Sequence, residues 1–405
     1  MSVDNFTVFT VCNIAYLPKA LMLADSLYRF HGKKLNIVLF DKKQEFKHPS
    51  EHITIQWVGD LGVPRWQELA FMYDIIEFST SLKPFIAMQL LRENNKVIFL
   101  DPDTEIFSKL DPILEDLEAA SVVLTPHYIR PQPDTENESD LAMMRFGSFN
   151  LGFFAVKSDR NAIEFLEWWS KRCIDFSFME SQFGLSTDQK WVSIAPCFFD
   201  FLKISFNPGY NAAPWNTFER KITSIDGDGH YYLNEKYKMV FFHFSNFDHL
   251  DPQYLNKRAS SELSVDYKNL EILGKNYSKN LLDMEAKVEK VQYTFDYMSD
   301  GSYISPTLRR AYAAVRGSFS TNHDPFDTSG EVGKFAKKNH LYQKNQKKYS
   351  YPSLKESKKH SIKFLIVYFL MRKLLEFSGP NKFYDLSKLM VYLSSYRKNI
   401  SLWVK

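Results

Sequence analysis

Two aspartates separated by one proline, Asp101 and Asp103, are the residues of this sequence best suited to chemistry. They follow an apolar run, residues 96–100, in the stretch KVIFLDPDTEIF. Two carboxylates at this spacing can reach one Mg²⁺ or Mn²⁺, because these hard ions prefer carboxylate oxygen and keep positions for water and phosphate. The bare pattern also fits a polar turn after a strand, capped by Asp101 or Asp103.

A phosphatase-type site is one alternative for these acids. Phosphotransferases of the haloacid dehalogenase type use DxDx[TV], in which the first Asp is a nucleophile. Here Glu105 occupies the last position of that pattern, and Thr104 stands one place too early. That pattern also normally follows the first strand, whereas this one lies about a hundred residues into the chain. The sequence therefore disfavours a phosphatase.

Further candidates lie in two other polar segments that adjoin apolar runs. His243, in VFFHFSNF, could complete a Mn²⁺ site begun by carboxylates, or it could be a packed core histidine. Asp188 and Gln189, in STDQKW, suit hydrogen bonding to sugar hydroxyls, although Thr187 or Asp188 could equally cap a helix.

The segment GYNAAPWNTFER places Asn211, Trp215 and Asn216 close together. An aromatic ring beside amides can cover the apolar face of a sugar while the amides bind its hydroxyls. A Pro-Trp anchor of the loop in the core explains the same residues equally well.

Several well-known motifs are missing. The sequence contains no GxxxxGK[ST], GxGxxG or GxSxG pattern, which disfavours P-loop kinases, most dinucleotide enzymes and α/β-hydrolases. The three cysteines, Cys12, Cys173 and Cys197, are far apart, which predicts neither a disulfide framework nor a zinc site.

The first hundred residues alternate strand and helix patterns, which predicts an α/β fold with a mainly parallel, buried sheet. In such sheets ligands bind beyond the carboxyl ends of strands, where Asn13, Asp41 and the Asp101/Asp103 pair are expected. The predicted strands are 6–12, 35–40, 53–58 and 96–100, and the predicted helices are 17–30 and 83–94, the second opened by Pro84.

Farther along the chain, the pattern predicts more strands, a hairpin and a largely helical end. Ser158 or Asp159 is expected to cap a helix over 158–173. The other expected elements are strands 121–125, 149–157 and 238–247, a surface loop at 131–142, a hairpin turn at 226–229, a mostly helical region at 262–316 and a linker at 339–361.

Charge is unevenly distributed. Residues 331–405 contain 17 Lys or Arg and 4 Asp or Glu, a formal charge of +13, whereas residues 1–330 carry 34 basic and 44 acidic residues. Two helices are expected in the tail, at 362–376 and 383–398, and the apolar stretch from Phe364 to Met371 is too short to span a bilayer. The tail fits contact with anionic lipid or packing on the folded domain, and it fits nucleic acid less well.

The N-terminus, MSVDNFTVFT, lacks a basic region followed by a long apolar stretch, so no signal peptide is expected. We expect a cytoplasmic protein, peripheral on the inner face of the plasma membrane if the tail binds lipid.

Eight segments, in order, resemble bacterial GT-A-fold glycosyltransferases of polysaccharide biosynthesis, which are similar to glycosyltransferase family eight. The likeness covers roughly the first four-fifths of the chain, and eight ordered segments are far more specific than DxD alone. The segments are CNIAYLPKALMLADSL (12–27), EFSTSLKPF (77–85), VIFLDPDTEIF (97–107), LTPH (124–127), FNLGFFAVK (149–157), STDQKW (186–191), GYNAAPWN (209–216) and FFHFSNF (241–247).

The resemblance implies a GT-A fold, a Rossmann-like nucleotide-diphospho-sugar transferase fold in the α/β class, with a helical, basic C-terminal extension. We expect a catalytic domain over 1–260, a helical continuation over 261–338, and a basic linker with amphipathic helices over 339–405. It further implies a UDP-sugar donor, Mn²⁺ or Mg²⁺, and a glycan or lipid-linked oligosaccharide acceptor.

The resemblance also assigns roles to individual residues. Asp101, Asp103 and His243 match the metal site, and Asp188 and Gln189 match a DQ pair below the anomeric carbon. The residues expected to meet the donor are Asn13 and Tyr16 at the uridine, Lys83 at a basic position that is often Arg in relatives, Asn150 and Gly152 in an N-x-G segment, and Asn211 and Trp215 in the GYNAAPWN segment.

One departure from the family is the ending HFSNF, which lacks the HxxGxxKPW pattern and its diphosphate contacts. Family-eight relatives retain the anomeric configuration, so front-face displacement is the expected mechanism. Two competing hypotheses are that the protein is a catalytically silent GT-A domain acting as a scaffold, or that it is a sugar nucleotidyltransferase. The latter normally has a Gly-rich loop after its first strand, and CNIAYLPKA contains no glycine.

Overall fold

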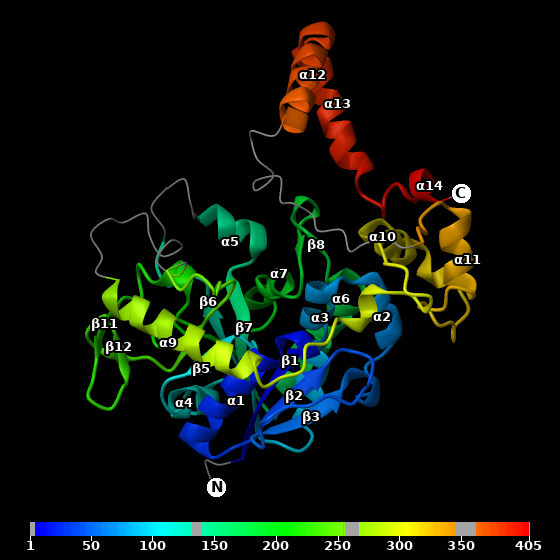
Figure 1. Cartoon of the computed structure of the whole chain (residues 1–405). Coiled ribbons are helices and arrows are strands. Elements are labelled where there is room, and N and C mark those ends of the chain that lie inside the picture. Colours follow the sequence, from blue (N-terminus) through cyan, green and yellow to red (C-terminus); the bar gives the residue numbers. More distant parts are fainter. Residues whose placement is uncertain (1–4, 132–139, 254, 256–266, 345–361, 405) are drawn as a thin grey trace. The chain divides into compact units, whose positions relative to one another are not determined.

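The structure is a computed structural model that describes residues 5–131, 140–253, 255, 267–344 and 362–404 (Figure 1). The chain divides into two compact units, the first of residues 1–66 and 75–294, and the second of residues 67–74 and 295–405. Every predicted site residue belongs to the first unit. The domain boundary predicted after residue 260 falls outside the described residues.

The first unit is built on a seven-stranded sheet of order β10-β6-β7-β4-β1-β2-β3. All neighbouring strands are parallel except at β7, which runs antiparallel to both β4 and β6. The strands are β1 (Phe6–Cys12), β2 (Leu35–Leu39), β3 (Ile53–Trp57), β4 (Lys96–Leu100), β6 (Val122–Pro126), β7 (Phe149–Lys157) and β10 (Leu202–Ile204). This arrangement and the helical C-terminal part confirm the predicted fold class.

Helices cover both faces of the sheet, which explains why its strands read as continuous apolar runs. Helices α1 (Leu17–His31) and α4 (Asp111–Ala119) pack on one face of the sheet and share a hydrophobic core with the strand side chains that point to that face. On the other face lie α3 (Ile75–Leu90) and α6 (Arg160–Phe176). There, Phe154 of β7 stacks on Phe99 of β4 at 5.3 Å and meets Trp169 of α6 at 5.1 Å.

Strand direction determines where the functional edge lies. Because β7 runs antiparallel, its first residues lie at the same edge as the carboxyl ends of β1, β4 and β6. Residues that follow these three strands and residues that begin β7 therefore converge, although they are far apart in sequence.

A short second sheet brings a distant segment to this edge. Strand β14 (Phe241–His243) pairs antiparallel with β5 (Thr104–Ile106), with His243 opposite Thr104. A meander of β11 (Ile222–Ile225), β12 (Tyr231–Leu233) and β13 (Tyr237–Lys238) precedes β14. The hairpin expected at residues 226–229 connects β11 and β12 and is confirmed.

The prediction that a helix begins near Pro84 is wrong about the first residue of that helix. Helix α3 begins at Ile75, and Pro84 lies inside it. Proline removes one hydrogen bond, to the carbonyl four residues earlier. The apolar face of Phe78, Leu82 and Ile86 nevertheless continues buried across the proline, so packing against the sheet keeps the helix intact.

Two other predicted boundaries also need correction. Residues 132–139 of the predicted surface loop lie outside the described residues, but its end forms helix α5 (Asp140–Phe146). The strand predicted over 238–247 ends at His243, because the chain then turns and the Phe244 N–H donates to the Asp103 carbonyl at 2.8 Å.

Helix α6 follows Asp159, whose carboxylate accepts the Ala162 N–H at 2.9 Å, which confirms one of the two predicted caps.

The second unit is helical. The buried Arg309 of α10 (Pro306–Val315) holds residues 70–73 to this unit by donating to the carbonyls of Ala70, Phe71 and Tyr73. Helices α9 (Lys268–Glu285, of the first unit) and α10 lie in the range predicted to be mostly helical. The remaining helices are α2 (Trp66–Met72), α11 (Glu331–Lys338), α12 (Ile362–Ser378), α13 (Pro380–Leu393) and α14 (Ile400–Trp403).

The two helices predicted in the tail correspond to α12 and α13. Residues 345–361 of the predicted linker lie outside the described residues. Within the described part of the chain, no helix combines the length and the hydrophobicity needed to cross a bilayer.

Candidate active site

The Asp-Pro-Asp segment turns the chain sharply where β4 leaves the sheet. The Asp101 N–H still pairs with β7, through the Gly152 carbonyl at 2.8 Å, and the Asp101 carbonyl accepts the Thr104 N–H at 3.1 Å. The turn is thus closed by backbone groups. The side chains of both aspartates also face partners outside the turn, so capping alone does not explain the two acids.

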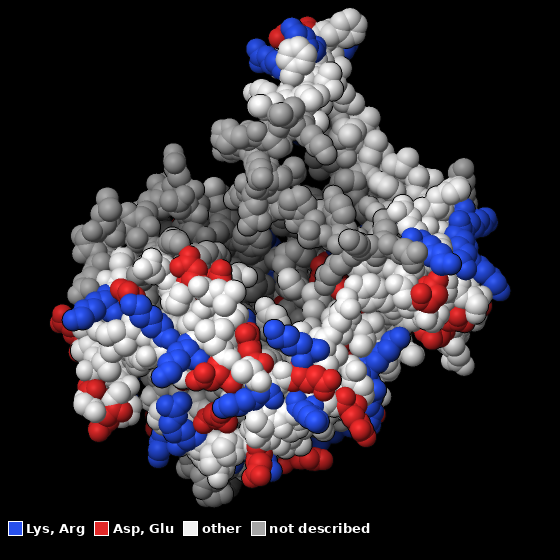
Figure 2. Space-filling model, in the orientation of Figure 1, with Lys and Arg blue, Asp and Glu red and all other residues white. Residues whose placement is uncertain are grey.

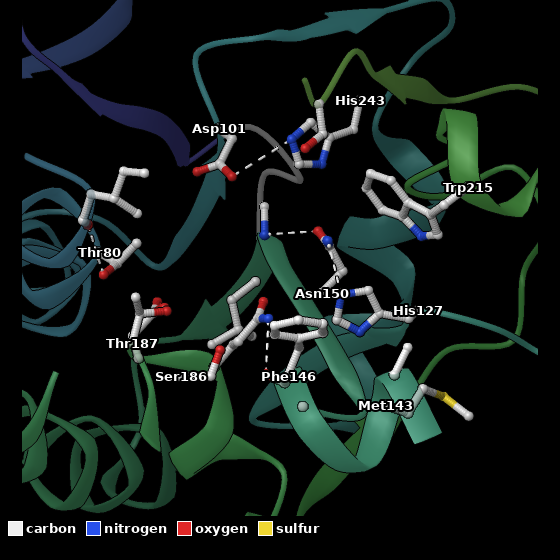
Figure 3. Close-up of a pocket in the computed structure, with 18 of the residues that line it drawn as sticks. Thr80, Asp101, His127, Met143, Phe146, Asn150, Ser186, Thr187, Trp215 and His243 are labelled. Atoms are coloured by element: carbon white, nitrogen blue, oxygen red, sulfur yellow. Dashed lines mark hydrogen bonds and ion pairs between the residues drawn. The ribbon is translucent and has the colours of Figure 1, made fainter. Parts of the chain in front are cut away.

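Those partners converge on His243. Its Nε2 lies 3.1 Å from Asp103 Oδ1 and 3.7 Å from Asp101 Oδ2. One ligand atom from each of the three residues lies within 4.8 Å of the others. Figure 3 shows Asp101 and His243 pointing toward one another across the cavity. The pairing of β5 with β14 creates this group, because it sets His243 beside the turn that carries both aspartates.

Attraction between opposite charges controls the protonation of this group. Burial opposes charge on both side chains, yet the imidazole holds the pKa of Asp103 below its ordinary value, and Asp103 holds the pKa of His243 above its own. The site therefore favours a positive charge next to its carboxylates.

The donor set suits a divalent metal ion. Two carboxylate oxygens and one imidazole nitrogen are ligands that Mn²⁺ accepts, and Mg²⁺ accepts the carboxylates. Lys83 supplies positive charge beside Asp101 and Asp188, and a divalent cation would supply it beside Asp101 and Asp103 in place of a protonated His243. Asp101, Asp103 and His243 are the residues that would hold the ion.

Gly152 permits the close approach of His243. A Cβ atom at this position would lie 2.4 Å from His243 Cε1 and 2.6 Å from Nδ1, far inside contact distance. The Gly152 N–H also donates to Asn150 Oδ1 at 3.0 Å. The N-x-G segment therefore places a flat surface of backbone against the imidazole.

Lys83 is surrounded by acceptors and is almost fully buried. Its Nζ donates to the Leu151 carbonyl at 2.9 Å and lies 3.5 Å from Asp101 and 3.4 Å from Asp188. Burial works against its charge, but the two carboxylates outweigh that effect and raise the pKa of Lys83. The ammonium bridges Asp101 and Asp188, which are distant in sequence, and it lines the two cavities described below.

Asp188 and Gln189 lie on the other side of Lys83. Asp188 is buried, and burial raises its pKa although Lys83 opposes the shift. Its Oδ1 accepts the hydroxyl of Thr187, a residue with a φ of 48° that directs the chain into the short helix α7 (Gln189–Val192). Gln189 Nε2 donates to the Phe146 carbonyl at 3.0 Å, so this amide also fixes α5.

A network of amides forms the wall beside β7. Asn211 Nδ2 donates to Asn150 Oδ1 at 3.1 Å and to Thr125 Oγ1 at 3.0 Å. Asn211 itself has a φ of 53°, and the buried Arg220 donates to its carbonyl at 2.9 Å. Asn211 therefore orients Asn150 from behind, and it does not line either cavity described below.

Trp215 and His127 complete this wall. The Trp215 ring meets the His243 ring edge-on at 5.5 Å and lies 6.0 Å from His127. His127, which follows β6, lies 3.3 Å from Asn150 through its Nε2. His127 ends the LTPH segment and was not among the predicted site residues; its position directly after a strand is the signal that could have found it.

Asn13 and Tyr16 lie at the end of β1. Asn13 is buried and its Oδ1 accepts the Tyr16 N–H at 3.0 Å, whereas the Tyr16 ring is largely exposed. Asp41, the other strand-end acid, accepts the N–H groups of Ile14 and Thr294 at 2.8 and 3.0 Å. Asp41 thus supports the turn that carries Asn13 and does not line a cavity described here.

Two cavities meet at the acidic group. One, of about 350 Å³, is lined by Asn13, Tyr16, Asp103 and neighbouring residues. The other, of about 430 Å³, is lined by Asn150, Gly152, Asp188, Gln189 and Trp215 among others. Both cavities are lined by Lys83, Asp101 and His243. Both are also lined by Ser245 and Asn246 of the HFSNF segment, which differs from the family pattern. The site thus offers two connected compartments with charged groups at their junction.

No family model matches the chain. The chain is 25% identical over 314 residues to YfnD, an uncharacterized protein of Bacillus subtilis (strain 168), covering 74% of this chain and 94% of YfnD. Among solved structures it is similar to the galactosyltransferase LgtC in complex with donor and acceptor sugar analogs, with a TM-score of 0.42, 12% identity, and coverage of 71% of this chain and 97% of LgtC.

A second similar structure is the glycosyltransferase GlyE of Streptococcus pneumoniae TIGR4. The TM-score is 0.40 and the identity 15%, with 72% of this chain and 66% of GlyE covered. Both solved structures are glycosyltransferases, and neither comparison assigns the chain to family eight.

Replacing Gly152 tests the close packing of His243. We expect Gly152→Ala to weaken Mn²⁺ binding at least about 10-fold, because the new methyl group displaces the imidazole that completes the ligand set. Isothermal titration with MnCl₂ measures the affinity. Gly227→Ala is the matched control, since a Cβ there meets nothing within 4 Å. Equal Mn²⁺ affinity in wild type and Gly152→Ala would contradict this packing.

The histidine beside Asn150 predicts a pH dependence of stability. Desolvation lowers the pKa of His127 to about 4, and nearby backbone carbonyls oppose this only in part. Since the unfolded chain binds this proton near pH 6.5, stability present above pH 6.5 is lost as pH falls toward 4, by up to about 3 kcal/mol. Urea unfolding across this range should show a smaller loss in His127→Gln. A loss as large as in wild type would show that another group is responsible.

Proposed function

We propose that this protein is a metal-dependent glycosyltransferase of bacterial surface polysaccharide biosynthesis. It moves a sugar from a nucleotide-sugar donor, a UDP-sugar, to a glycan or lipid-linked acceptor with retention of anomeric configuration. The observation that carries the proposal is the meeting of Asp101, Asp103 and His243 at the junction of two cavities. A nucleoside and a sugar joined by a diphosphate fit such a pair of compartments.

The donor would lie across the junction. Asn13 and Tyr16 line the compartment assigned to uridine, while Asn150, Gly152 and Trp215 line the compartment assigned to the sugar. A bound Mn²⁺ or Mg²⁺ would neutralise the diphosphate and make it a better leaving group. Ser245 and Asn246 line both compartments, so the segment after His243 reaches the diphosphate position without the lysine of the family pattern.

In the reaction, the bond between the anomeric carbon and the diphosphate oxygen breaks, and a bond to the acceptor oxygen forms on the same face. The acceptor proton passes to the departing phosphate oxygen. Asp188 and Gln189 would steady the positive charge that develops at the sugar, since they line the sugar compartment. Lys83 keeps Asp188 next to a cation and so favours its charged, acceptor form.

A catalytically silent scaffold is the alternative function. It would require no particular arrangement of Asp101, Asp103 and His243, whereas the structure brings ligand atoms of all three within 4.8 Å of one another. An assay for UDP release from a panel of UDP-sugars separates the two functions.

The metal ligands provide the direct test of the proposed activity. We expect Asp101→Ala with Asp103→Ala to lower Mn²⁺-dependent donor hydrolysis by at least about 100-fold, because the leaving diphosphate loses its charge stabilisation. Donor turnover that is intact in this variant would rule the mechanism out. The matched control is Asp226→Ala with Asp228→Ala, since these acids form a similar group with His230 in the turn between β11 and β12.

We also propose that the tail binds an anionic membrane surface. Helix α12 exposes a continuous apolar stretch, Leu365–Met371, on all sides, because seven consecutive residues cover about two helical turns. Figure 2 shows uncharged surface along the helix pair below a tip that carries both basic and acidic side chains. The formal charge of +13 over residues 331–405 favours anionic lipid. The protein would then act at the inner face of the plasma membrane.

Flotation with vesicles tests this contact in the full-length protein. We expect Ile366→Asp with Phe369→Asp to lower the fraction bound to phosphatidylglycerol-containing vesicles at least about fivefold, since both side chains are exposed on α12. Phe206→Asp, at an exposed position of the first unit, is the control. Unchanged co-flotation of the double variant would contradict membrane contact through α12.

A further inference from the structure

An exposed apolar surface borders the sugar compartment. We name it the apolar rim and define it as Ile76, Leu141, Met144, Phe146 and Met179. All five side chains are exposed, Leu141 and Met144 by 70% and 72%. Ile76, Phe146 and Met179 also line the cavity that contains Asp101 and Asp188, so the rim continues from the cavity wall to the surface.

Helix α5 is held by polar contacts of its backbone and of Arg145. The Phe146 carbonyl accepts Gln189 Nε2 at 3.0 Å, and the Met144 carbonyl accepts Lys190 Nζ. Arg145 Nε donates to Ser181 Oγ at 3.2 Å. No residue of α5 is buried. Leu141 and Met144 are the most exposed apolar side chains of this helix.

The rim and the cavity floor differ in chemistry. The floor carries Asp101, Asn150 and Asp188, which suit hydroxyl groups. Large apolar side chains clustered at the surface indicate contact with an apolar group. A ligand that matches both is amphiphilic, with a sugar at one end and a hydrocarbon at the other. Met143, which Figure 3 shows at one end of the cavity, adds a flexible apolar side chain on α5.

We propose that the apolar rim binds the hydrocarbon of a lipid-linked acceptor whose sugar hydroxyl enters the cavity. This inference rests on the proposed function and narrows its acceptor to a glycan carrying a lipid close to the reacting sugar. The rim is continuous with the cavity in which that sugar reacts. Because Ile76, Phe146 and Met179 line the same cavity as Asp188, a ligand that contacts both must carry its apolar group next to its sugar, as a lipid-linked glycan does.

Alkyl glycosides test the proposal without knowledge of the natural acceptor. Saturation-transfer NMR on the full-length protein compares n-octyl with methyl glycosides of glucose, galactose and N-acetylglucosamine, below the micelle concentration. For at least one sugar we expect the octyl compound to bind at least about 10-fold more tightly than the methyl compound, because its chain leaves water at the rim. We expect Leu141→Asn with Met144→Asn to reduce that ratio to about 2-fold or less.

The control variant is Phe198→Asn, at an exposed apolar position of the same unit that lines neither cavity. It should keep the wild-type octyl-to-methyl ratio. Equal binding of octyl and methyl compounds to the wild type overturns the inference, as does an equal loss of the ratio in the rim and control variants. Because this readout is binding, it is separate from donor hydrolysis: loss of hydrolysis alone overturns the proposed function, and loss of the octyl preference alone overturns only the choice of acceptor.

Discussion

The compensation of buried negative charge is the constraint on which the rest of this site depends. Asp101, Asp103 and Asp188 converge at one edge of the sheet, where burial makes the isolated carboxylates of Asp103 and Asp188 costly. Lys83 lies between Asp101 and Asp188, and His243 faces Asp101 and Asp103, so Asp101 is shared by both. In the proposed function, the carboxylates would bind a divalent cation, and through that cation the diphosphate of the donor.

Meeting this constraint requires contacts between segments that are far apart in the chain. Strand β14 must pair with β5 to present His243, and Gly152 must lack a side chain so that the imidazole can approach. Helix α3 must continue across Pro84, since Lys83 lies at that point of the helix. The group of metal-ligating side chains therefore depends on all three features at once.

Much of the scaffold was predictable, because its signals are local. The strands at 6–12 and 149–157, the cap at Asp159 and the turn at 226–229 follow from alternating or continuous apolar runs and from side chains that bond their own backbone. The start of α3 was not predictable in this way, because the tertiary packing of Phe78, Leu82 and Ile86 keeps the helix intact across Pro84. Asp41 was expected among the residues that meet the ligand, yet its carboxylate accepts the backbone N–H groups of Ile14 and Thr294.

The sequence by itself determined the acidic pair after a buried strand, the candidate partners and the class of fold, because these depend on residue type and short spacing. Only the tertiary structure decided that both carboxylates of KVIFLDPDTEIF face one histidine, since the β5–β14 pairing joins residues about 140 positions apart. It also decided that Lys83 bridges two acids and that an apolar rim borders the cavity lined by Asp188. Such arrangements depend on which strand edges meet, and no local pattern encodes that.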